Sequence, residues 1–451
     1  MRIYYKATIE ATDKLCYTSI LNMKENILQT AHNIHCIGIK GTGLSALAGI
    51  LQAQGKNVTG SDANGPLHDA KNITSNIDLI LYSAAVPPEN IERKTAQAEG
   101  IPELSYPEAL GIVTQNYKTI AICGTHGKTT TTSMVATILK DEIDPTILVG
   151  ANISVLNGHN FYLGKGEYFI IEACEYQRHF LHYYPDIICV TNIELDHVDY
   201  FQDENDYEDA FTSFFLRLSK KGVIVVPKEN PKVMKLIEQI QEKRPDISVI
   251  SYSKEDPEFA KIQPSIPGEH NRYNGLAAIK TAQTVITINE EAIQKINNFT
   301  GATRRFEQFI CANGQVIIDD YAHHPTAVKA TLKAARAKFG PDKTILCVFQ
   351  PHQHSRTRKL LNGFLGSFTD ANEVIIPNIY QTRDSQEDIQ SMSAESFVEE
   401  LSKHHPNVYY GHGLEKTLYD IQNRQDDFDV IIFMGAGDII TISDQLKYSS
   451  R

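Results

Sequence analysis

A short glycine-containing loop between an apolar strand and a helix is the feature that most constrains the fold of this chain. The apolar run Thr119–Cys123 predicts a buried strand, the letters GTHGKT follow, and a helix is predicted from Thr129. The usual phosphate loop, G-x-x-x-x-G-K-[ST], would place its first glycine where this chain has Ile122. The loop is shorter than that pattern, yet its flanking strand and helix are those of a nucleotide site. We expect Lys128 to contact phosphate groups and the Thr129 hydroxyl to bind Mg²⁺.

The same order of strand, loop and helix recurs along the sequence. The run Ile34–Ile39 predicts a strand that leads into a glycine-rich turn, and helical spacing of apolar residues continues until Gly55. A further strand is predicted at Asp78–Val86. The last third holds four more units, which contain the letters GQVIIDDYAHHP, TILCVFQPH, EVIIPNIY and FDVIIFMGAGDII. This alternation predicts an α/β fold with a parallel sheet in each domain.

A length of 451 residues is compatible with about three domains. Both Met1 and Met23 are open as the start of the chain, because the first predicted strand begins only at Ile34. The expected parts are an N-terminal extension at 1–33, a first domain at 34–113, a linker at 112–118, a central domain at 118–297 and a C-terminal domain at 302–451.

Charge and cysteine content exclude several classes of function. Acidic residues number 55 against 43 basic ones, a net charge of -12, which disfavours general nucleic-acid binding. No apolar run reaches the roughly 18 residues of a membrane span, and residues 1–33 lack the continuous apolar core of a signal peptide. The seven cysteines form no C-x-x-C pair, which fits reduced thiols rather than disulfides or a zinc site. We expect a cytoplasmic protein, a monomer or weak homodimer, that binds neither nucleic acid nor membranes.

Polar residues follow three predicted strands of the central domain at the edge where parallel strands end. The glycine loop follows the first strand, Glu172 ends the apolar run YFIIE, and Asn192 and His197 follow the run IICV. Taken singly, Glu172 is more readily a helix cap and His197 a loop histidine without a special role. Their convergence with a phosphate loop on one edge instead favours a cation site beside a nucleotide.

Eight separated motifs occur in colinear order between residues 34 and 445, and together they resemble the Mur ligase family. They read GTHGKTT, EACEYQRHF, TNIELDHVDYF, GEHNRYNGLAA, RRFE, DDYAHHP, FQPHQHSRTR and MGAGDI. The resemblance implies three domains: a Rossmann-like N-terminal domain for a UDP-sugar, a central P-loop ATPase-like sheet domain for ATP and Mg²⁺, and a Rossmann-like C-terminal domain for an amino acid. It is greatest to the alanine-adding branch, which implies an ATP-dependent ligase that joins L-alanine to the carboxylate of UDP-N-acetylmuramate. In such enzymes the carboxylate is first converted to an acyl phosphate, and the product is a peptidoglycan precursor.

The resemblance also assigns roles to individual positions. It implies that Thr129, Glu172 and His197 bind Mg²⁺. ATP would contact Gly124, Thr125, His126, Gly127, Lys128, Thr129, Thr130, His270, Asn271, Asn274, Arg305 and Asp320. The UDP-sugar would contact Gly38, Gly41, Thr42, Gly43, Asp62 and Ser83, and the amino acid Tyr321, His323, Arg356 and Arg358. The catalytic set would comprise Lys128, Glu175, Asn192, Arg305 and His323.

Two of these assignments have specific alternatives or arguments. From the sequence alone, His270, Asn271 and Asn274 are as readily a polar helix start as an adenine site. His323 is the more plausible base or amine-orienting group, because the unperturbed pKa of histidine lies near neutrality; a capping or packing histidine is the alternative.

Departures from the family pattern leave rival functions open. Gln353 stands where the family often has an arginine after FQPH, so the resemblance leaves the second contact to the amino-acid carboxylate open. One rival is the recycling ligase that adds a tripeptide to the same UDP-sugar; FQPHQHSRTR favours the smaller acceptor. Another is a non-catalytic ATP-binding regulatory protein, against which the complete set of Thr129, Glu172 and His197 argues. A dehydrogenase would rest on the first glycine turn alone, which is not G-x-G-x-x-G.

Overall fold

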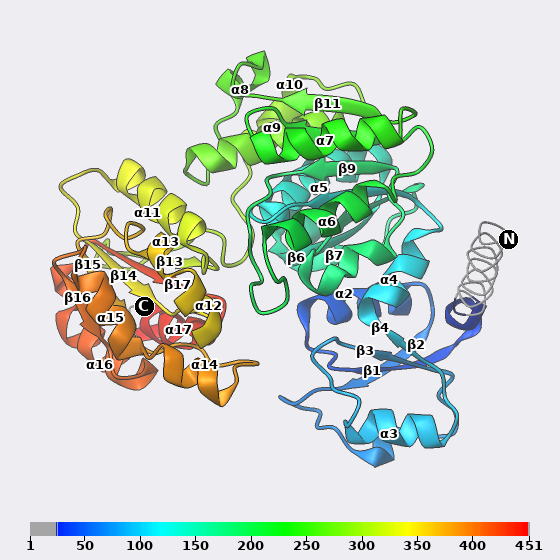
Figure 1. Cartoon of the computed structure of the whole chain (residues 1–451), viewed down its shortest axis with the longest axis horizontal. Helices are drawn as coiled ribbons and strands as arrows, with labels where there is room; N and C mark the ends of the chain where they lie inside the picture. The colour runs from blue at the N-terminus through cyan, green and yellow to red at the C-terminus, as the bar shows by residue number, and fades with distance from the viewer. Residues whose placement is uncertain (1–23, 25, 450–451) are drawn as a thin grey trace, which may run out of the picture.

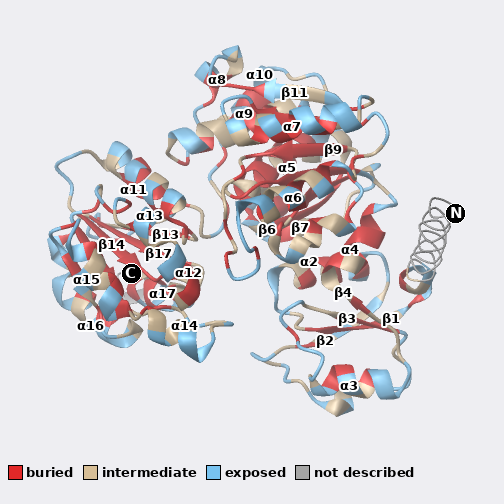
Figure 2. Ribbon diagram, viewed as in Figure 1, coloured by how far each residue is buried: buried red, intermediate tan, exposed pale blue. Residues whose placement is uncertain are grey.

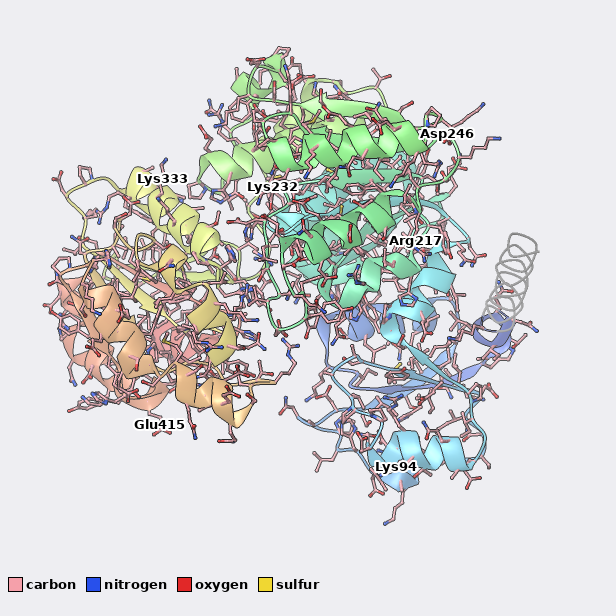
Figure 3. All side chains as sticks on the ribbon, in the orientation of Figure 1. Lys94, Arg217, Lys232, Asp246, Lys333 and Glu415 are labelled. Atoms are coloured by element: carbon pink, nitrogen blue, oxygen red, sulfur yellow. The ribbon has the colours of Figure 1, made fainter. Side chains whose placement is uncertain are left out.

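Three separate sheets organise the chain in the computed structural model, which describes residue 24 and residues 26–449 (Figure 1). Most of the expected N-terminal extension, with both candidate start residues, lies outside the described residues. Each sheet has helices packed on its faces, and the strands form the most buried layer of each domain (Figure 2). Exposed charged side chains such as Lys94, Lys333 and Glu415 lie on outward faces of the helices (Figure 3). Within residues 26–449, no helix combines the length and apolar character that crossing a bilayer requires.

The first sheet has four parallel strands in the order β2-β1-β3-β4. Apolar side chains of α2 and α4 cover one face, and α3 packs on the other. The helix α4 runs through 112–114, so the expected linker at 112–118 is wrong in its first half: Ile112 and Val113 are buried and continue the helix. The elements are β1 (Asn33–Ile37), α2 (Thr42–Ala53), β2 (Asn57–Ser61), η1 (Ala70–Asn72), β3 (Leu79–Tyr82), α3 (Ile91–Ala98), β4 (Glu103–Ser105) and α4 (Tyr106–Thr114).

The central sheet has seven strands in the order β11-β10-β9-β5-β8-β6-β7. Its strands are β5 (Lys118–Cys123), β6 (Thr146–Ile153), β7 (His159–Tyr162), β8 (Tyr168–Glu172), β9 (Ile187–Val190), β10 (Val223–Pro227) and β11 (Ser248–Tyr252). Its helices are α5 (Lys128–Ile143), η2 (Ser154–Leu156), η3 (Tyr176–His182), α6 (Glu204–Phe215), α7 (Pro231–Lys243), α8 (Pro257–Lys261), α9 (Glu269–Ala282) and α10 (Glu290–Asn297).

The third sheet has six strands in the order β12-β13-β17-β14-β15-β16. Its strands are β12 (Glu307–Ile310), β13 (Val316–Asp320), β14 (Ile345–Phe349), β15 (Glu373–Ile376), β16 (Val408–Tyr410) and β17 (Val430–Met434). Its helices are α11 (Pro325–Phe339), α12 (His354–Lys359), α13 (Leu361–Phe364), α14 (Gln386–Ser391), α15 (Ala394–Ser402), α16 (Leu414–Arg424), η4 (Gln425–Asp427) and α17 (Ile440–Ser449).

The prediction of wholly parallel sheets is wrong at two edges. The strand β7 pairs antiparallel with β6, and β12 pairs antiparallel with β13. Both connections are short. A parallel neighbour would need a crossover of a dozen or more residues, usually through a helix, so these two strands pair antiparallel. The remaining pairs are parallel, so the strand ends that carry the candidate site share one edge of the central sheet.

The first and central domains share a continuous apolar core. One hydrophobic cluster runs from α2 and α4 into the central sheet and its helix α6. Backbones approach closely at this contact: a Cβ on Gly111 of α4 would lie 2.4 Å from the carbonyl oxygen of His182 at the end of η3. Asn160 of β7 also donates a hydrogen bond to the carbonyl of Thr42 at the start of α2. These contacts fix the first domain against the central one.

We expect Gly111→Ala to destabilise the protein by about 1–3 kcal/mol, since the added methyl group meets backbone that cannot move aside. This loss should exceed the gain that alanine normally brings to a helix. Denaturant unfolding measures it. Gly366→Ala is the matched control, because a Cβ there meets no atom within 4 Å; equal stability of the two variants would contradict the close packing of α4 on η3.

Candidate active site

The glycine loop lies flat against two neighbouring segments of the central domain. Gly124 and Gly127 both have positive φ, at 130° and 82°. A Cβ on Gly124 would lie 2.1 Å from Thr191 Oγ1, and one on Gly127 would lie 2.5 Å from Asn274 Oδ1. Both positions therefore require glycine for conformation and for space. The loop places the first turn of α5, with Lys128, directly at the end of β5.

Hydrogen bonds between the glycine loop and the segment after β9 hold the loop in place. Asn192 accepts a hydrogen bond from the His126 backbone N–H (3.0 Å) and donates one to the His126 carbonyl (2.8 Å). The Thr125 hydroxyl donates to the carbonyl of Glu194 and accepts from its N–H. Asn192, expected in the catalytic set, thus holds the loop conformation in this structure.

A buried charge cluster lies beside the loop. Lys128 Nζ forms an ion pair with Glu175, at 2.8 Å from Oε2, and donates to the carbonyls of Gly124 and Thr125. His197 Nε2 lies 3.4 Å from Glu175 Oε1. Burial alone would raise the pKa of Glu175, but Lys128 and then His197 lower it, so this carboxylate is ionised. Burial opposes the charge on Lys128 too, yet Glu175 raises the pKa of the lysine and keeps it protonated.

A second contact joins the loop to the end of β8 and to the C-terminal domain. The Thr129 hydroxyl donates to Glu172 Oε1 (3.0 Å), and Glu172 Oε2 accepts the N–H of Gly150 (2.8 Å). Arg305, from the segment before β12, donates from Nη2 to Thr129 Oγ1 (3.2 Å). The threonine hydroxyl and the carboxylate are hard oxygen donors at one place, which is the ligand type that Mg²⁺ prefers.

The expected adenine residues lie on the first turns of α9. His270 is exposed there, whereas Asn271 is buried and donates to the carbonyl of Pro267 (2.7 Å). Asn274 lies against Gly127 and donates to Asn271 Oδ1 (3.3 Å). The structure thereby brings α9 to the glycine loop. Thr130 is buried in the first turn of α5.

The Asp320 carboxylate binds backbone N–H groups of its own domain. Its carboxylate accepts the N–H groups of Phe306 (2.9 Å) and Ala322 (2.7 Å), and burial raises its pKa. The expected contact to a nucleotide stays a prediction. Beside it, the guanidinium of Arg305 lies 4.9 Å from the ring centre of Tyr321, so this ring holds the arginine at the interface.

Arg356 forms a buried ion pair across the two domains. Its Nη2 lies 2.6 Å from Asp196 Oδ1, and both side chains are almost fully buried. Burial alone would raise the pKa of Asp196, but Arg356 holds it well below the usual range. The Nε–H of Arg356 is buried and has no hydrogen-bond partner among the described residues, so one donor remains for a further carboxylate.

His323 lies beside Arg356, and its protonation equilibrium differs from that of a free histidine. Burial, and then the charge of Arg356, lower its pKa well below 6.5. Its Nδ1 donates to the Tyr321 carbonyl (2.8 Å), which leaves the Nε2 lone pair free to accept a proton or hydrogen bond. The argument from an unperturbed histidine pKa is therefore wrong: the imidazole is neutral at pH 7. A role in orienting an amine stays a prediction.

Two other expected features of the amino-acid site differ in placement. Arg358 is exposed. Hydrogen bonds from Ser385, and then the charge of Arg358, lower the pKa of Asp388 in α14. Gln353 is buried with a positive φ of 68°, and its amide donates to the carbonyl of Thr382 (3.2 Å). The arginine that the family often has here is thus replaced by a side chain that binds its own domain.

The expected UDP-sugar residues gather at the carboxyl ends of the strands β1, β2 and β3. Gly38 has φ 85°, and a Cβ there would lie 2.9 Å from the Cβ of Ser83. Asp62 accepts the N–H of Lys40 (2.9 Å), which closes the glycine turn onto the end of β2. The other members, Gly41, Thr42 and Gly43, begin α2 at the same edge.

Three residues without an assigned role from the sequence lie at the interface of the central and C-terminal domains. Glu194 contacts His126 and Thr326, Asp196 pairs with Arg356, and His324 caps α11. The acidic pair lies within the letters NIELDH after β9, directly before His197, which is the one signal that the sequence offers. Two of the partners, Thr326 and Arg356, come from another domain, so spacing alone does not find them.

Family comparisons agree with this geometry. The Mur ligase middle domain matches residues 122–263, the "Mur ligase, glutamate ligase domain" matches 304–437, and the "Mur ligase family, catalytic domain" matches 33–118. The UDP-N-acetylmuramate–L-alanine ligase of Clostridium acetobutylicum is 37% identical over 447 residues, which cover 91% of this chain and 96% of that protein. The chain belongs to the Mur ligase family. A ligase of the same name from Alkaliphilus metalliredigens is also 37% identical, over 94% of this chain and 98% of its own length.

Solved Mur ligases share the fold. UDP-N-acetylmuramate-alanine ligase MurC from Thermotoga maritima superposes with a TM-score of 0.76 at 24% identity, over 93% of this chain and 99% of its own. A murein peptide ligase from Psychrobacter arcticus gives 0.68 at 23% identity, over 93% and 98%. The resemblance and the three-domain α/β architecture expected from the sequence are confirmed.

We expect Asp196→Asn to destabilise this Mur ligase by about 3–5 kcal/mol, because it leaves the Arg356 charge buried without a partner. Thermal and denaturant unfolding measure the loss. Asp196→Asn combined with Arg356→Met should recover part of it, since the unpaired charge is then gone. Asp420→Asn removes an exposed pair with Lys416 and should cost less than about 1 kcal/mol; an equal loss at both aspartates would contradict the importance of burial.

Proposed function

We propose that this Mur ligase joins L-alanine to the carboxylate of UDP-N-acetylmuramate, with ATP as co-substrate, in cytoplasmic peptidoglycan precursor synthesis. The observation that carries the proposal is the junction of Lys128, Thr129 and Arg305 at one interface, with the buried pair of Arg356 and Asp196 on the same domain boundary. Relatives named for this reaction, at 37% identity over most of the chain, support it. We assign the UDP-sugar to residues 34–113, ATP to 118–297 and the amino acid to 302–451.

The first half-reaction transfers the γ-phosphoryl group of ATP to the sugar carboxylate. A carboxylate oxygen attacks phosphorus, the bond to ADP breaks, and an acyl phosphate forms. Both partners are anionic, so their approach needs positive charge and fixed geometry. Lys128 supplies an ammonium group that stays charged, and the backbone N–H groups of the glycine loop surround the phosphates. Arg305 adds a second cation from the C-terminal domain, so closure of that domain completes the site.

Thr129 and Glu172 fit a magnesium ion. Their oxygen atoms lie 3.0 Å apart, and the N–H of Gly150 orients the carboxylate. His197 lies 3.4 Å from Glu175, the partner of Lys128, and is the candidate for a second ion. When bound, Mg²⁺ supplies the charge that neutralises the phosphate oxygens during transfer.

We assign the second half-reaction to the surroundings of Arg356. The amine attacks the acyl carbon, the amide bond forms, the bond from that carbon to the phosphate oxygen breaks, and the departing phosphate takes up the proton that the amine loses. The Nε–H of Arg356, which has no partner among the described residues, would bind the alanine carboxylate through a charge-assisted hydrogen bond. The neutral His323 accepts a hydrogen bond from the amine at Nε2 and so orients it.

ADP release with UDP-N-acetylmuramate should depend on L-alanine and proceed far more slowly with a tripeptide acceptor. A coupled ADP assay compares L-alanine, glycine, L-serine and the tripeptide. A preference for the tripeptide would instead assign the recycling reaction, and ADP formation without any acceptor dependence would assign a non-catalytic nucleotide switch.

We expect Arg356→Lys to raise the KM for alanine about tenfold to a hundredfold, while the KM for ATP stays unchanged. Lysine preserves the charge opposite Asp196 but lacks the Nε–H donor. The same exchange at the exposed Arg358 should leave both constants near those of the parent enzyme. If the two variants behave alike, Arg356 does not bind the acceptor carboxylate.

We expect Glu172→Gln to raise the Mg²⁺ concentration for half-maximal ADP release by about tenfold or more, because an amide is a weaker ligand than a carboxylate. Chelation of Mg²⁺ should stop turnover in the parent enzyme, and added Mg²⁺ should restore it. Glu167→Gln, at an exposed residue just before β8 that pairs with Lys118, is the control. An unchanged Mg²⁺ requirement in Glu172→Gln would remove Glu172 from the metal site.

A further inference from the structure

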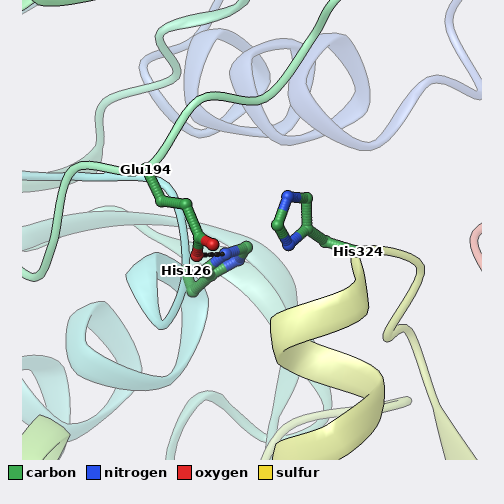
Figure 4. A group of neighbouring side chains, drawn as sticks. All are labelled: His126, Glu194 and His324. Atoms are coloured by element: carbon green, nitrogen blue, oxygen red, sulfur yellow. Dashed lines mark hydrogen bonds and ion pairs between the residues drawn. The ribbon is translucent and has the colours of Figure 1, made fainter. Parts of the chain in front are cut away.

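Three potential metal ligands meet where the glycine loop touches the C-terminal domain (Figure 4). His126 lies in the glycine loop, Glu194 lies in the segment after β9, and His324 is the residue that caps α11. One ligand atom of each lies within 4.8 Å of the other two. We propose that His126, Glu194 and His324 form a binding site for a transition-metal dication of the Zn²⁺ type, distinct from the magnesium site of the ligase reaction.

The geometry is close to what such an ion needs. His126 Nε2 and Glu194 Oε2 are 2.9 Å apart, and the two imidazole rings have centres 4.7 Å apart and planes tilted by 48°. Zn–N and Zn–O bonds of about 2.0–2.2 Å in a tetrahedron separate ligand atoms by about 3.4 Å. Small side-chain rotations therefore bring all three atoms to a single centre, with water as the fourth ligand.

All three ligand atoms already take part in hydrogen bonds that an ion would replace. The backbone N–H of Thr326 donates to His324 Nδ1 over 3.3 Å, so this nitrogen carries a lone pair, and an ion bound there would displace that N–H. His126 Nε2 and Glu194 Oε2 share a hydrogen bond of 2.9 Å, and an ion between them would replace its proton. Binding would therefore release a proton, as is general for metals at histidine ligands.

Outer hydrogen bonds already orient the ligands. The Thr326 hydroxyl donates to Glu194 Oε1 (2.7 Å), which leaves Oε2 directed at His126. The His126 backbone is held by Asn192. Such outer partners are typical of built metal sites. Two imidazoles and one carboxylate also differ from the oxygen donors of Thr129 and Glu172, so the sites prefer different ions.

A metal here would join two domains. Because His126 shares the glycine loop with Lys128, the ion would tether the nucleotide loop to the first turn of α11. The metal site thus goes beyond the proposed ligase reaction and does not require it.

The test uses Co²⁺ as a coloured substitute for Zn²⁺ on the full-length, untagged and metal-free protein in excess Mg²⁺. We expect one Co²⁺ per chain with the strong visible absorption of a four-coordinate site, displaced by Zn²⁺. Glu194→Gln and His324→Asn should each weaken binding at least tenfold; asparagine can still cap α11. His404→Asn, at an exposed histidine elsewhere in the C-terminal domain, should bind like the parent protein.

Thr326→Val provides an independent arm. It keeps all three ligands and removes only the hydroxyl that orients Glu194, so we expect about tenfold weaker Co²⁺ binding in a folded protein. Absence of the four-coordinate spectrum in the parent protein would overturn the proposal, as would equal binding by the parent, Glu194→Gln and Thr326→Val. Neither readout involves ATP turnover, so failure here leaves the ligase proposal intact.

Discussion

The adjacency of β9, β5 and β8 at the middle of the central sheet is the constraint on which the site depends. All three strands run parallel, so the glycine loop, Glu172 and the loop with Asn192 end at one edge. The buried pair of Lys128 and Glu175 then binds these segments together. An ammonium group held this way is already desolvated and oriented, which reduces the reorganisation that phosphate binding requires.

The two domain interfaces have different physical characters. The first domain joins the central one through a continuous apolar cluster and close backbone contacts. The central and C-terminal domains meet through polar contacts, such as Arg305 with Thr129 and Arg356 with Asp196. Polar interfaces are typical of domains that move relative to one another, whereas large apolar interfaces are not. The division implies that the first two domains move as one body and that the C-terminal domain moves against them.

The sequence predicts what lies within one βα unit and not what joins two domains. The strand, loop and helix around Gly124 and Lys128 follow from apolar runs and glycine positions, and the same rule places Glu172 at a strand end. The partners that Asp196 and Glu194 find in the C-terminal domain, Arg356 and Thr326, lie 160 and 132 positions away, which no spacing rule covers. The pKa of His323 is a property of its burial beside Arg356, so an argument from free histidine fails there. Alternation of strand and helix predicts only parallel pairs, so it does not predict that β7 and β12 pair antiparallel with their neighbours through short connections.

The ion pair of Arg356 and Asp196 links acceptor binding to domain position. Arg356 belongs to α12 of the C-terminal domain, and Asp196 to the central loop that leads to His197. In the proposed reaction, a carboxylate that binds at Nε of this guanidinium competes with Asp196 for one positive charge, and the two anions repel each other. Both domains shield the pair from water, which strengthens this repulsion as well as the attraction. By linkage, a carboxylate bound there must weaken the interdomain pair by the same free energy that the pair takes from its binding. Amino-acid binding and the position of Arg305, which lies on the same domain, are therefore parts of one equilibrium in this proposal.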